Sequence, residues 1–140
     1  MKNDTLEMAF LAEPNDVNFG GQVHGGEVMK WMDQIGYALA VRYSRGYAVT
    51  KFVDNIDFKK PMKIGHLVHL KAQITSTGQS SMNIDIEVTS EDLGTGLIVH
   101  NCSCTMVFVA IDDEGKKRVL SKSWKNKMNL IVSQKNSKRI

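Results

Sequence analysis

The chain is poor in proline and cysteine, with two of each among its 140 residues, and it lacks any long hydrophobic run. Because no stretch of about 18 apolar residues is present, we expect no membrane-spanning helix. The first ten residues carry Asp4 and Glu7 and lack an apolar stretch with a cleavage site, so we expect no signal peptide and a cytoplasmic protein. Cys102 and Cys104 lie two residues apart in a strand-like segment, which suits neither a disulfide nor a metal site. We expect buried free thiols.

Acidic residues are missing from the C-terminal part. Nine Lys or Arg and no Asp or Glu follow Gly115, whereas nine basic and fifteen acidic residues precede it. A basic tail can hold an anionic partner such as phosphate or nucleic acid, or it can be a solvated, partly disordered terminus. The length and the 42% apolar content suit one globular domain, which we assign to residues 1–120, with 121–140 as the tail.

One apolar stretch without proline lies between residues 25 and 43. Its apolar residues fall at spacings of three and four, which predicts a helix. They are Val28, Trp31, Met32, Ile35, Leu39 and Tyr43. Further apolar residues occupy the other sides, so we expect a helix that other structure wraps on all sides. A turn-rich loop over 13–21 precedes this helix, and 5–11 is typical of a short edge strand.

After Gly46 the period of the pattern changes to two. Alternating apolar and polar residues predict antiparallel strands with one buried face. These strands are 48–58 (broken near Asn55), 68–74, 82–88 and 97–111. One long helix and these strands fit an α+β fold, in which a single sheet of five or six strands curls around the helix.

Asp33 is out of place in this pattern, because it lies between Met32 and Ile35 in the most apolar helix. A buried carboxylate is costly unless it is paired or used, so Asp33 is either a structural group bonded to a neighbour or a functional one. At the start of the same helix, Gly25 and Gly26 offer unpaired backbone N–H groups and the positive end of the helix dipole to an anion.

The spacing of these two features limits how they can act together. Gly25 and Asp33 are eight residues apart, which is about 12 Å along a helix. One substrate carbonyl cannot lie about 3 Å from both groups of a single chain. If both act on one substrate, the site lies between two copies of the protein.

A series of short motifs spans residues 5–120. It comprises Asp16-Val17-Asn18, Gly20-Gly21-Gln22-Val23-His24-Gly25-Gly26, Lys30-Trp31-Met32-Asp33, Val49-Thr50, Val53-Asp54-Asn55-Ile56-Asp57-Phe58, Pro61, Gly65, Thr77-Gly78-Gln79-Ser80-Ser81-Met82, Phe108-Val109-Ala110-Ile111-Asp112 and Gly115. In order and spacing the series resembles the hot-dog acyl-coenzyme A thioesterases, of the bacterial short-chain and brain acyl-CoA hydrolase type. Val17 departs from the family, which usually has Thr there, and 121–140 matches nothing.

The resemblance implies a hot-dog fold whose protomers pair as dimers, three of which commonly form a hexamer. Asp33 matches the catalytic aspartate, and Asn18 matches the asparagine that completes the site from the opposite protomer. Asp33 would act as general base on water, or attack the thioester carbonyl directly. The amides of Gly25 or Gly26 would stabilise the oxyanion. The implied products are a free fatty acid and coenzyme A, with no cofactor or metal.

Coenzyme A (CoA) also needs a binding path for its pantetheine arm and phosphates. The resemblance places the turn at 77–81 close to this path, and the lysines beside Pro61 are candidates for the phosphates. The residues assigned to CoA binding are Thr77, Gly78, Ser80, Ser81, Lys59 and Lys60. Arg118 and Lys122 are further candidates for the phosphates.

Two other functions are compatible with parts of the sequence. A dehydratase of the same fold would need a His paired with a carboxylate, and position 33 is Asp with no His in the matching register. A non-catalytic acyl-CoA-binding or regulatory hot-dog protein would use the basic tail as an anion contact. The sequence contains neither a helix-turn-helix nor a zinc module, so a nucleic-acid partner is disfavoured. It also lacks the Gly-x-Ser-x-Gly motif of serine hydrolases.

Overall fold

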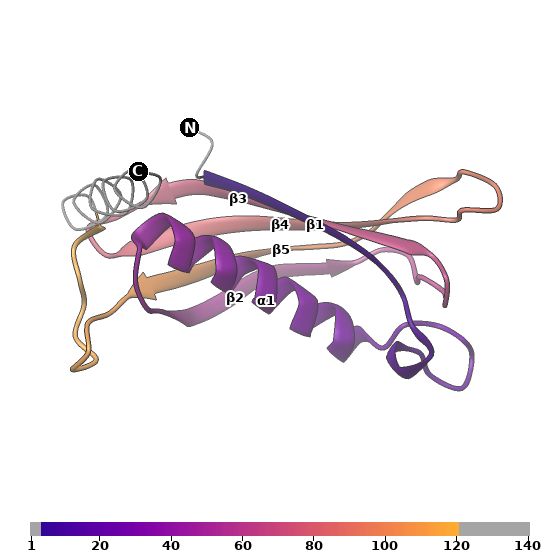
Figure 1. Cartoon of the computed structure of the whole chain (residues 1–140), viewed down its shortest axis with the longest axis horizontal. Helices are drawn as coiled ribbons and strands as arrows, with labels where there is room; N and C mark the ends of the chain where they lie inside the picture. The colour runs from indigo at the N-terminus through magenta and orange to yellow at the C-terminus, as the bar shows by residue number, and fades with distance from the viewer. Residues whose placement is uncertain (1–3, 121–140) are drawn as a thin grey trace, which may run out of the picture.

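The structure, a computed structural model, describes residues 4–120, and the tail assigned to 121–140 lies outside them. One long helix lies across one face of a five-stranded sheet (Figure 1). The elements are β1 (Thr5–Leu11), the short 3-10 helix η2 (Pro14–Asp16), α1 (Gly25–Ser44), β2 (Ala48–Phe58), β3 (Leu67–Thr77), β4 (Ser81–Glu91) and β5 (Ile98–Ala110).

The sheet has the strand order β1-β3-β4-β5-β2, and every neighbouring pair is antiparallel. The α+β class and the five strands are therefore confirmed, with β1 and β2 at the two edges. The expected break in β2 is also present. Asn55 has a left-handed φ of 54°, and the pairing with β5 shifts between Asp54 and Asp57. Such a bulge bends the edge strand locally.

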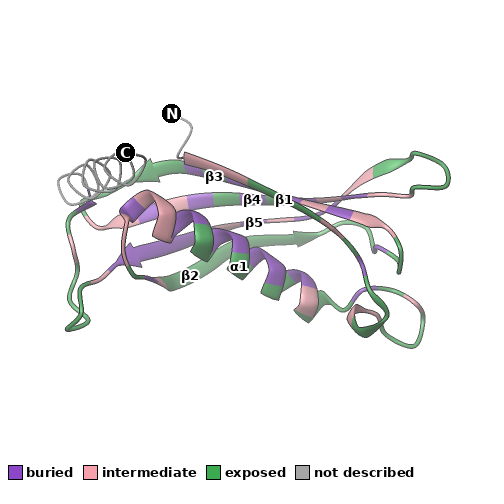
Figure 2. Ribbon diagram, in the orientation of Figure 1, coloured by how far each residue is buried: buried purple, intermediate pink, exposed green. Residues whose placement is uncertain are grey.

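The core lies between α1 and the sheet, where buried residues form a continuous layer (Figure 2). Alternate residues of β4 and β5 point toward the helix, as their period of two predicts. The two surfaces approach closely at Gly36. A Cβ atom added there would lie 2.8 Å from the ring of Phe108, so the helix can pack this tightly only without a side chain at position 36.

The other face of α1 is open, which corrects the expectation of a helix wrapped on all sides. Met29, Asp33 and Tyr37 lie on this face and are exposed, with 42% of Met29 and 41% of Tyr37 accessible. Within the described chain the sheet provides only one packing surface, and one sheet covers only one side of a helix. The apolar residues of the second face therefore have no cover within the described part of one copy.

A further expectation is confirmed in the core. Cys102 and Cys104 are buried free thiols on the inner face of β5. Their sulfur atoms lie 3.9 Å and 3.5 Å from the sulfur of Met32. Within residues 4–120, α1 and any other helical segment fall short of the length and apolarity that crossing a membrane requires.

Candidate active site

Asp33 lies on the open face of α1, exposed rather than embedded in the core as the sequence predicted. A hydrogen bond fixes its carboxylate, because the hydroxyl of Thr50 donates to Asp33 Oδ1 over 3.0 Å. Thr50 stands near the start of β2, opposite Phe108 of β5. The bond holds one carboxylate oxygen and leaves the other available to a water molecule or a substrate.

Asn18 lies in the segment that joins η2 to α1. Its side-chain Oδ1 accepts hydrogen bonds from the backbone N–H groups of Gly20 (2.9 Å) and Gln22 (3.2 Å). The backbone N–H of Asn18 donates to Gln22 O over 2.8 Å and closes the turn. Because Oδ1 is used within the loop, the exposed Asn18 side chain presents its Nδ2 amide, which is a donor, to an incoming group.

The first turn of α1 borders a cavity of about 250 Å³. Gly25 is the first residue of the helix, and an N–H group at this position has no partner inside a helix. The cavity is lined by Val23, Gly25, Val28, Phe58, Lys59, Lys60, Pro61, Met62, Asn101 and Cys102. Its walls are largely apolar, with the first turn of the helix, two lysines and Asn101 as polar groups, which suits an apolar ligand with one polar end.

Within a single chain, Asp33, the amides at the start of α1 and Asn18 do not lie around one point. Gly25 and Asp33 belong to one continuous helix and are therefore about 12 Å apart along its axis. The loop that carries Asn18 lies still further out, past the helix start (Figure 1). The carboxylate and the proposed oxyanion donors of one copy cannot act on the same carbonyl.

The residues predicted to bind CoA fall into three places. Ser80 and Ser81 line a cavity of about 310 Å³ with Lys51, Gln79, Val109 and Lys117. Thr77 lines a separate cavity beside Tyr43 and Ile74. Lys59 and Lys60 line the cavity at the helix start instead. Lys51 lines the first of these cavities and Phe58 the last, and seven residues of β2 separate them, so the two cavities lie roughly 23 Å apart along the strand.

Arg118 has a structural role, which corrects its assignment as a phosphate contact. Its guanidinium group donates to Ser44 O (2.7 Å), Ser44 Oγ (3.1 Å) and Tyr47 O (3.2 Å). Partial burial lowers the pKa of Arg118. The charge lies at the C-terminal end of α1, where a cation stabilises the helix dipole. Lys122, the other candidate, lies outside the described residues.

Thr50 was missed as a site residue by the sequence reasoning. It forms part of the motif Val49-Thr50, but nothing in an alternating strand marks one Thr as a partner of a carboxylate. The contact depends on the tertiary structure, because residues 33 and 50 meet only when β2 packs against α1.

A family model described as the thioesterase superfamily matches residues 20–97, more than half of the chain. The chain belongs to this superfamily. The VdlD protein of Helicobacter pylori is 36% identical over 108 residues, which are 77% of this chain and 62% of that protein. A Haemophilus influenzae protein named as an uncharacterized acyl-CoA thioester hydrolase is 35% identical over 120 residues, covering 82% of this chain and 77% of that protein.

Among solved structures, the hexameric thioesterase y2039 from Yersinia pestis is similar in both sequence and fold. It is 35% identical, with a TM-score of 0.78, and the match covers 82% of this chain and 94% of that one. The hot-dog fold and the resemblance to the acyl-CoA thioesterases are confirmed. The chain spans 62% of the length of VdlD.

Proposed function

We propose that the protein is an acyl-coenzyme A thioesterase, which hydrolyses acyl-CoA to a free fatty acid and CoA. The observation that carries this proposal is the Asp33 carboxylate, which Thr50 holds on an open helix face. The name of the H. influenzae relative and the family membership support the same reaction.

In the proposed reaction, Asp33 takes a proton from a water molecule while the water oxygen attacks the thioester carbonyl. The carbonyl oxygen becomes an oxyanion, which the N–H groups of Gly25 and Gly26 of a second copy stabilise by about 3–4 kcal/mol. The C–S bond then breaks, and the proton held by Asp33 passes to the departing sulfur. Direct attack by Asp33 would instead break the C–S bond and form a mixed anhydride while CoA departs as a thiolate. Water then cleaves the anhydride, which regenerates the Asp33 carboxylate and gives the fatty acid, and a proton from this water passes to the thiolate.

Asn18 and Thr50 have supporting roles in this scheme. The Nδ2 group of Asn18 can only donate, so it orients the carbonyl oxygen or the attacking water. Thr50 restricts the Asp33 carboxylate to one orientation, with the second oxygen directed away from β2. A carboxylate held in place loses less entropy on reaching the reactive geometry.

A second copy is required to complete the proposed site. The open face of α1 and the part of β2 from Phe52 onward expose the side chains that a second copy would cover. They are Met29, Tyr37, Phe52, Val53, Ile56 and Phe58. Exposed apolar groups of this extent are typical of protein interfaces. We propose a dimer, three of which assemble into a hexamer; the Yersinia thioesterase, which is hexameric, supports an assembly of this size.

The remaining parts of the proposal concern the coenzyme and the compartment. We assign Lys59 and Lys60, beside the helix-start cavity, and the turn Thr77–Ser81 to binding of CoA. Gly78 belongs to this turn because its N–H donates to Ser81 O over 2.9 Å. No cofactor is needed, since CoA is part of the substrate. We place the protein in the cytoplasm.

The test is thiol release from acyl-CoA of several chain lengths by the wild type, Asp33→Ala and Asn18→Ala. We expect both variants to keep the wild-type circular dichroism spectrum and to lose at least about 100-fold in turnover, as after removal of a general base. Turnover of Asp33→Ala equal to that of the wild type would reject the proposed function.

A further inference from the structure

The segment between η2 and α1 presents an aromatic side chain to solvent. Phe19 directly follows Asn18 and is fully exposed, with a relative accessibility of 113%, whereas the next most exposed large apolar residue, Leu97, reaches 64%. Burial of a Phe ring is favourable because the ring has a large apolar area. Single apolar residues are common on protein surfaces, so a special role for Phe19 requires that the local backbone does not itself need an aromatic residue.

The turn that carries Phe19 is held by its own hydrogen bonds. Asn18 Oδ1 accepts from the N–H groups of Gly20 and Gln22, and the N–H of Gly21 donates to Asn18 O over 3.0 Å. Gly21 has a left-handed φ of 77°, which glycine adopts without strain. The residues on either side of the turn pair as an antiparallel bridge. Phe19 therefore projects from a fixed position.

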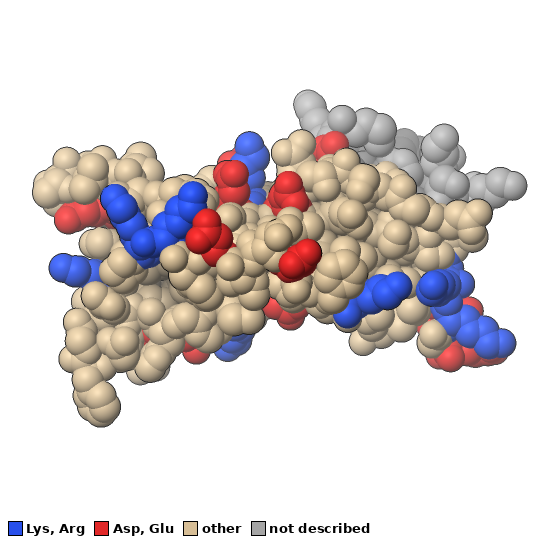
Figure 3. All heavy atoms as spheres, turned by 180° about the vertical axis from the view of Figure 1, so that it is seen from behind, with Lys and Arg blue, Asp and Glu red and all other residues tan. Residues whose placement is uncertain are grey.

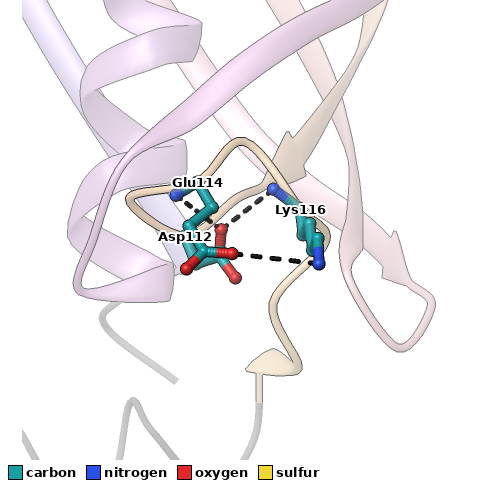
Figure 4. Close-up of polar contacts among 3 residues, drawn as sticks. All are labelled: Asp112, Glu114 and Lys116. Carbon is teal, nitrogen blue, oxygen red and sulfur yellow. Dashed lines mark hydrogen bonds and ion pairs between the residues drawn. The ribbon is translucent and has the colours of Figure 1, made fainter.

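A second turn with the same hydrogen bonds follows β5 and carries no aromatic residue (Figure 4). Asp112 Oδ1 accepts from the N–H groups of Glu114 and Lys116, each at 2.9 Å. The N–H of Gly115 donates to Asp112 O over 3.0 Å, and Gly115 has a φ of 83°. The second position of this turn is Asp113, which is exposed. The turn geometry thus accepts a charged residue at the position where the first turn has its aromatic ring.

An exposed aromatic pair lies on the same side of the molecule as Asp33. Tyr37 follows Asp33 by one helical turn, and its ring makes an edge contact with that of Tyr47, with the ring centroids 6.5 Å apart. Both side chains are exposed. On the sheet face turned away from α1, by contrast, acidic and basic side chains are interspersed (Figure 3). The tyrosine pair is therefore the more suitable surface for a further aromatic ring.

The proposed shared site determines how the helices of two copies face each other. It brings the start of α1 of each copy, at Gly25, beside Asp33 of the other copy. These two positions are about 12 Å apart along the helix, so both contacts form together only if the two helices run antiparallel. Each helix then covers the other from residue 25 to residue 33. Tyr37 lies beyond this overlap, opposite the segment that precedes α1 of the second copy.

That segment contains Asn18 and Phe19. In the proposed site, Asn18 lies beside Asp33 of the second copy, and the Cα atoms of consecutive residues are about 3.8 Å apart. Residues four apart on a helix surface are about 5–6 Å apart, so a ring attached next to Asn18 reaches a residue one turn from Asp33. In its own copy, the same ring lies before the start of α1, more than two turns from Asp33.

We infer that Phe19 of one copy packs against Tyr37 and Tyr47 of a second copy and forms an apolar wall of the shared site beside Asp33. The inference rests on the proposed function, because it uses the shared site. Asn18 and Phe19 enter that site on one turn, so the ring covers the side of the site that Asn18 completes. In a two-fold dimer each copy provides one such ring and receives one.

Photo-cross-linking tests this contact directly. An unlabelled copy with p-benzoylphenylalanine at position 19 is unfolded and refolded together with a wild-type copy that is labelled with heavy nitrogen. After irradiation, mass spectrometry of the cross-linked peptides identifies the attached residue and the copy that supplied it. We expect position 19 of the unlabelled copy to be joined to Tyr37 or Tyr47 of the labelled copy.

Cross-links confined to one copy, or joined to a different element of the second copy, would overturn the inference. So would the absence of cross-links between copies in a sample that light scattering shows to be assembled. The cross-link does not depend on hydrolysis. If the wild type is inactive, the proposed function fails, while a cross-link from position 19 to the two tyrosines of the second copy still supports the contact.

The variant Phe19→Asp tests what the contact contributes to assembly. We expect this variant to fold, because Asp113 occupies the equivalent position of the second turn. The Kd of the dimer should rise roughly 10- to 100-fold, since two buried rings are lost from each two-fold dimer. Thiol release per copy should fall as the variant is diluted and dissociates.

Leu93→Asp is the matched control, because it makes the same kind of change at an exposed apolar residue between β4 and β5. Analytical ultracentrifugation over a series of concentrations measures the Kd of each protein. We expect Leu93→Asp to dissociate like the wild type. A Kd for Phe19→Asp equal to that of the wild type would overturn the inference.

Discussion

At the scale of single residues, the arrangement of Asp33 and Thr50 shows what a carboxylate on an open helix face needs. An exposed carboxylate samples several rotamers unless a neighbour restrains it. The hydroxyl of Thr50 restrains Asp33 through a hydrogen bond of 3.0 Å to Oδ1. The bond reaches from β2 to α1 and so links the orientation of the reactive group to the packing of the edge strand. We regard Thr50 as a positioning residue, since its hydroxyl acts through Asp33.

Replacing Thr50 with Val removes this hydroxyl and keeps the branched shape of the side chain. We expect kcat to fall about 5- to 30-fold, which corresponds to a hydrogen bond to a charged group of roughly 1–2 kcal/mol. Stopped-flow thiol release measures the change, and Thr50→Ser, which keeps the hydroxyl, is the matched control. A kcat for Thr50→Val equal to that of Thr50→Ser would show that the bond does not assist the reaction.

The buried thiol of Cys104 predicts a pH dependence of stability. The pKa of Cys104 is raised from 9.0 to about 12, chiefly by burial and to a lesser extent by the nearby Cys102 and Asp85. The unfolded chain loses this proton near pH 9, whereas the folded chain keeps it until about pH 12. Stability from this group is therefore complete below pH 9 and falls as pH rises from 9 to 12.

Urea unfolding at a series of pH values between 8 and 11 measures this effect. We expect the free energy of unfolding to fall with pH more steeply in the wild type than in Cys104→Ala, because the variant lacks the titrating thiol. Parallel curves for the two proteins would contradict the raised pKa.

From the sequence, only those residues of the proposed site could be identified whose signal is local, and residues that meet only in the folded chain were missed. Asp33 was identifiable because a carboxylate interrupts an apolar helix. Thr50 was not, since Thr is ordinary in a strand. Lys51 and Lys117 meet only because residues 111–120 fold back onto the turn before β4. No spacing of residues in the sequence predicts that this segment folds back onto the turn.

At the scale of elements, α1 and the sheet were predictable because periods of 3.6 and two report which side of an element is buried. The helix expected at 25–43 is observed at Gly25–Ser44. The error concerned the second side of α1. Apolar residues there indicate burial, but they do not say whether the cover comes from the same chain or from a second copy.

The contact between α1 and β5 at Gly36 makes a prediction of its own. Gly36→Ala would gain about 1 kcal/mol from helix propensity. It would also place a methyl group 2.8 Å from a ring carbon of the fully buried Phe108 and 3.2 Å from Ile86 Cδ1. Overpacking of this kind costs about 1–3 kcal/mol, and a large ring enclosed on all sides cannot move aside. We expect a net loss of stability.

Thermal unfolding of Gly36→Ala and of Gly26→Ala tests this balance. Gly26 lies in the same helix, and nothing lies within 4 Å of a Cβ atom added there. We expect Gly36→Ala to lower Tm while Gly26→Ala leaves it unchanged or raises it. A rise in Tm for Gly36→Ala would show that the helix and sheet are less closely packed than the distances indicate.

At the scale of the whole molecule, the site that we propose is incomplete in the described chain, and the helix face that carries Asp33 is an uncovered apolar surface. Met29 and Tyr37 flank Asp33 on the open face of α1, and the aromatic residues of β2 extend that surface. A second copy would cover this apolar surface, and it would complete the proposed site if the N-terminal end of its α1 lay beside Asp33. Light scattering at micromolar concentration should then show a dimer or a hexamer. A fully active monomer would contradict the shared site.

The most direct test of the shared site mixes two inactive proteins. A copy with Asp33→Ala and a copy with Asn18→Ala are unfolded together, refolded and assayed for hydrolysis of acyl-CoA. In a mixed dimer, one of the two sites combines an intact Asp33 with an intact Asn18. Random pairing therefore predicts recovery of roughly a quarter of the wild-type activity. If each site were built within one copy, the mixture would stay as inactive as its components, and the account would be wrong.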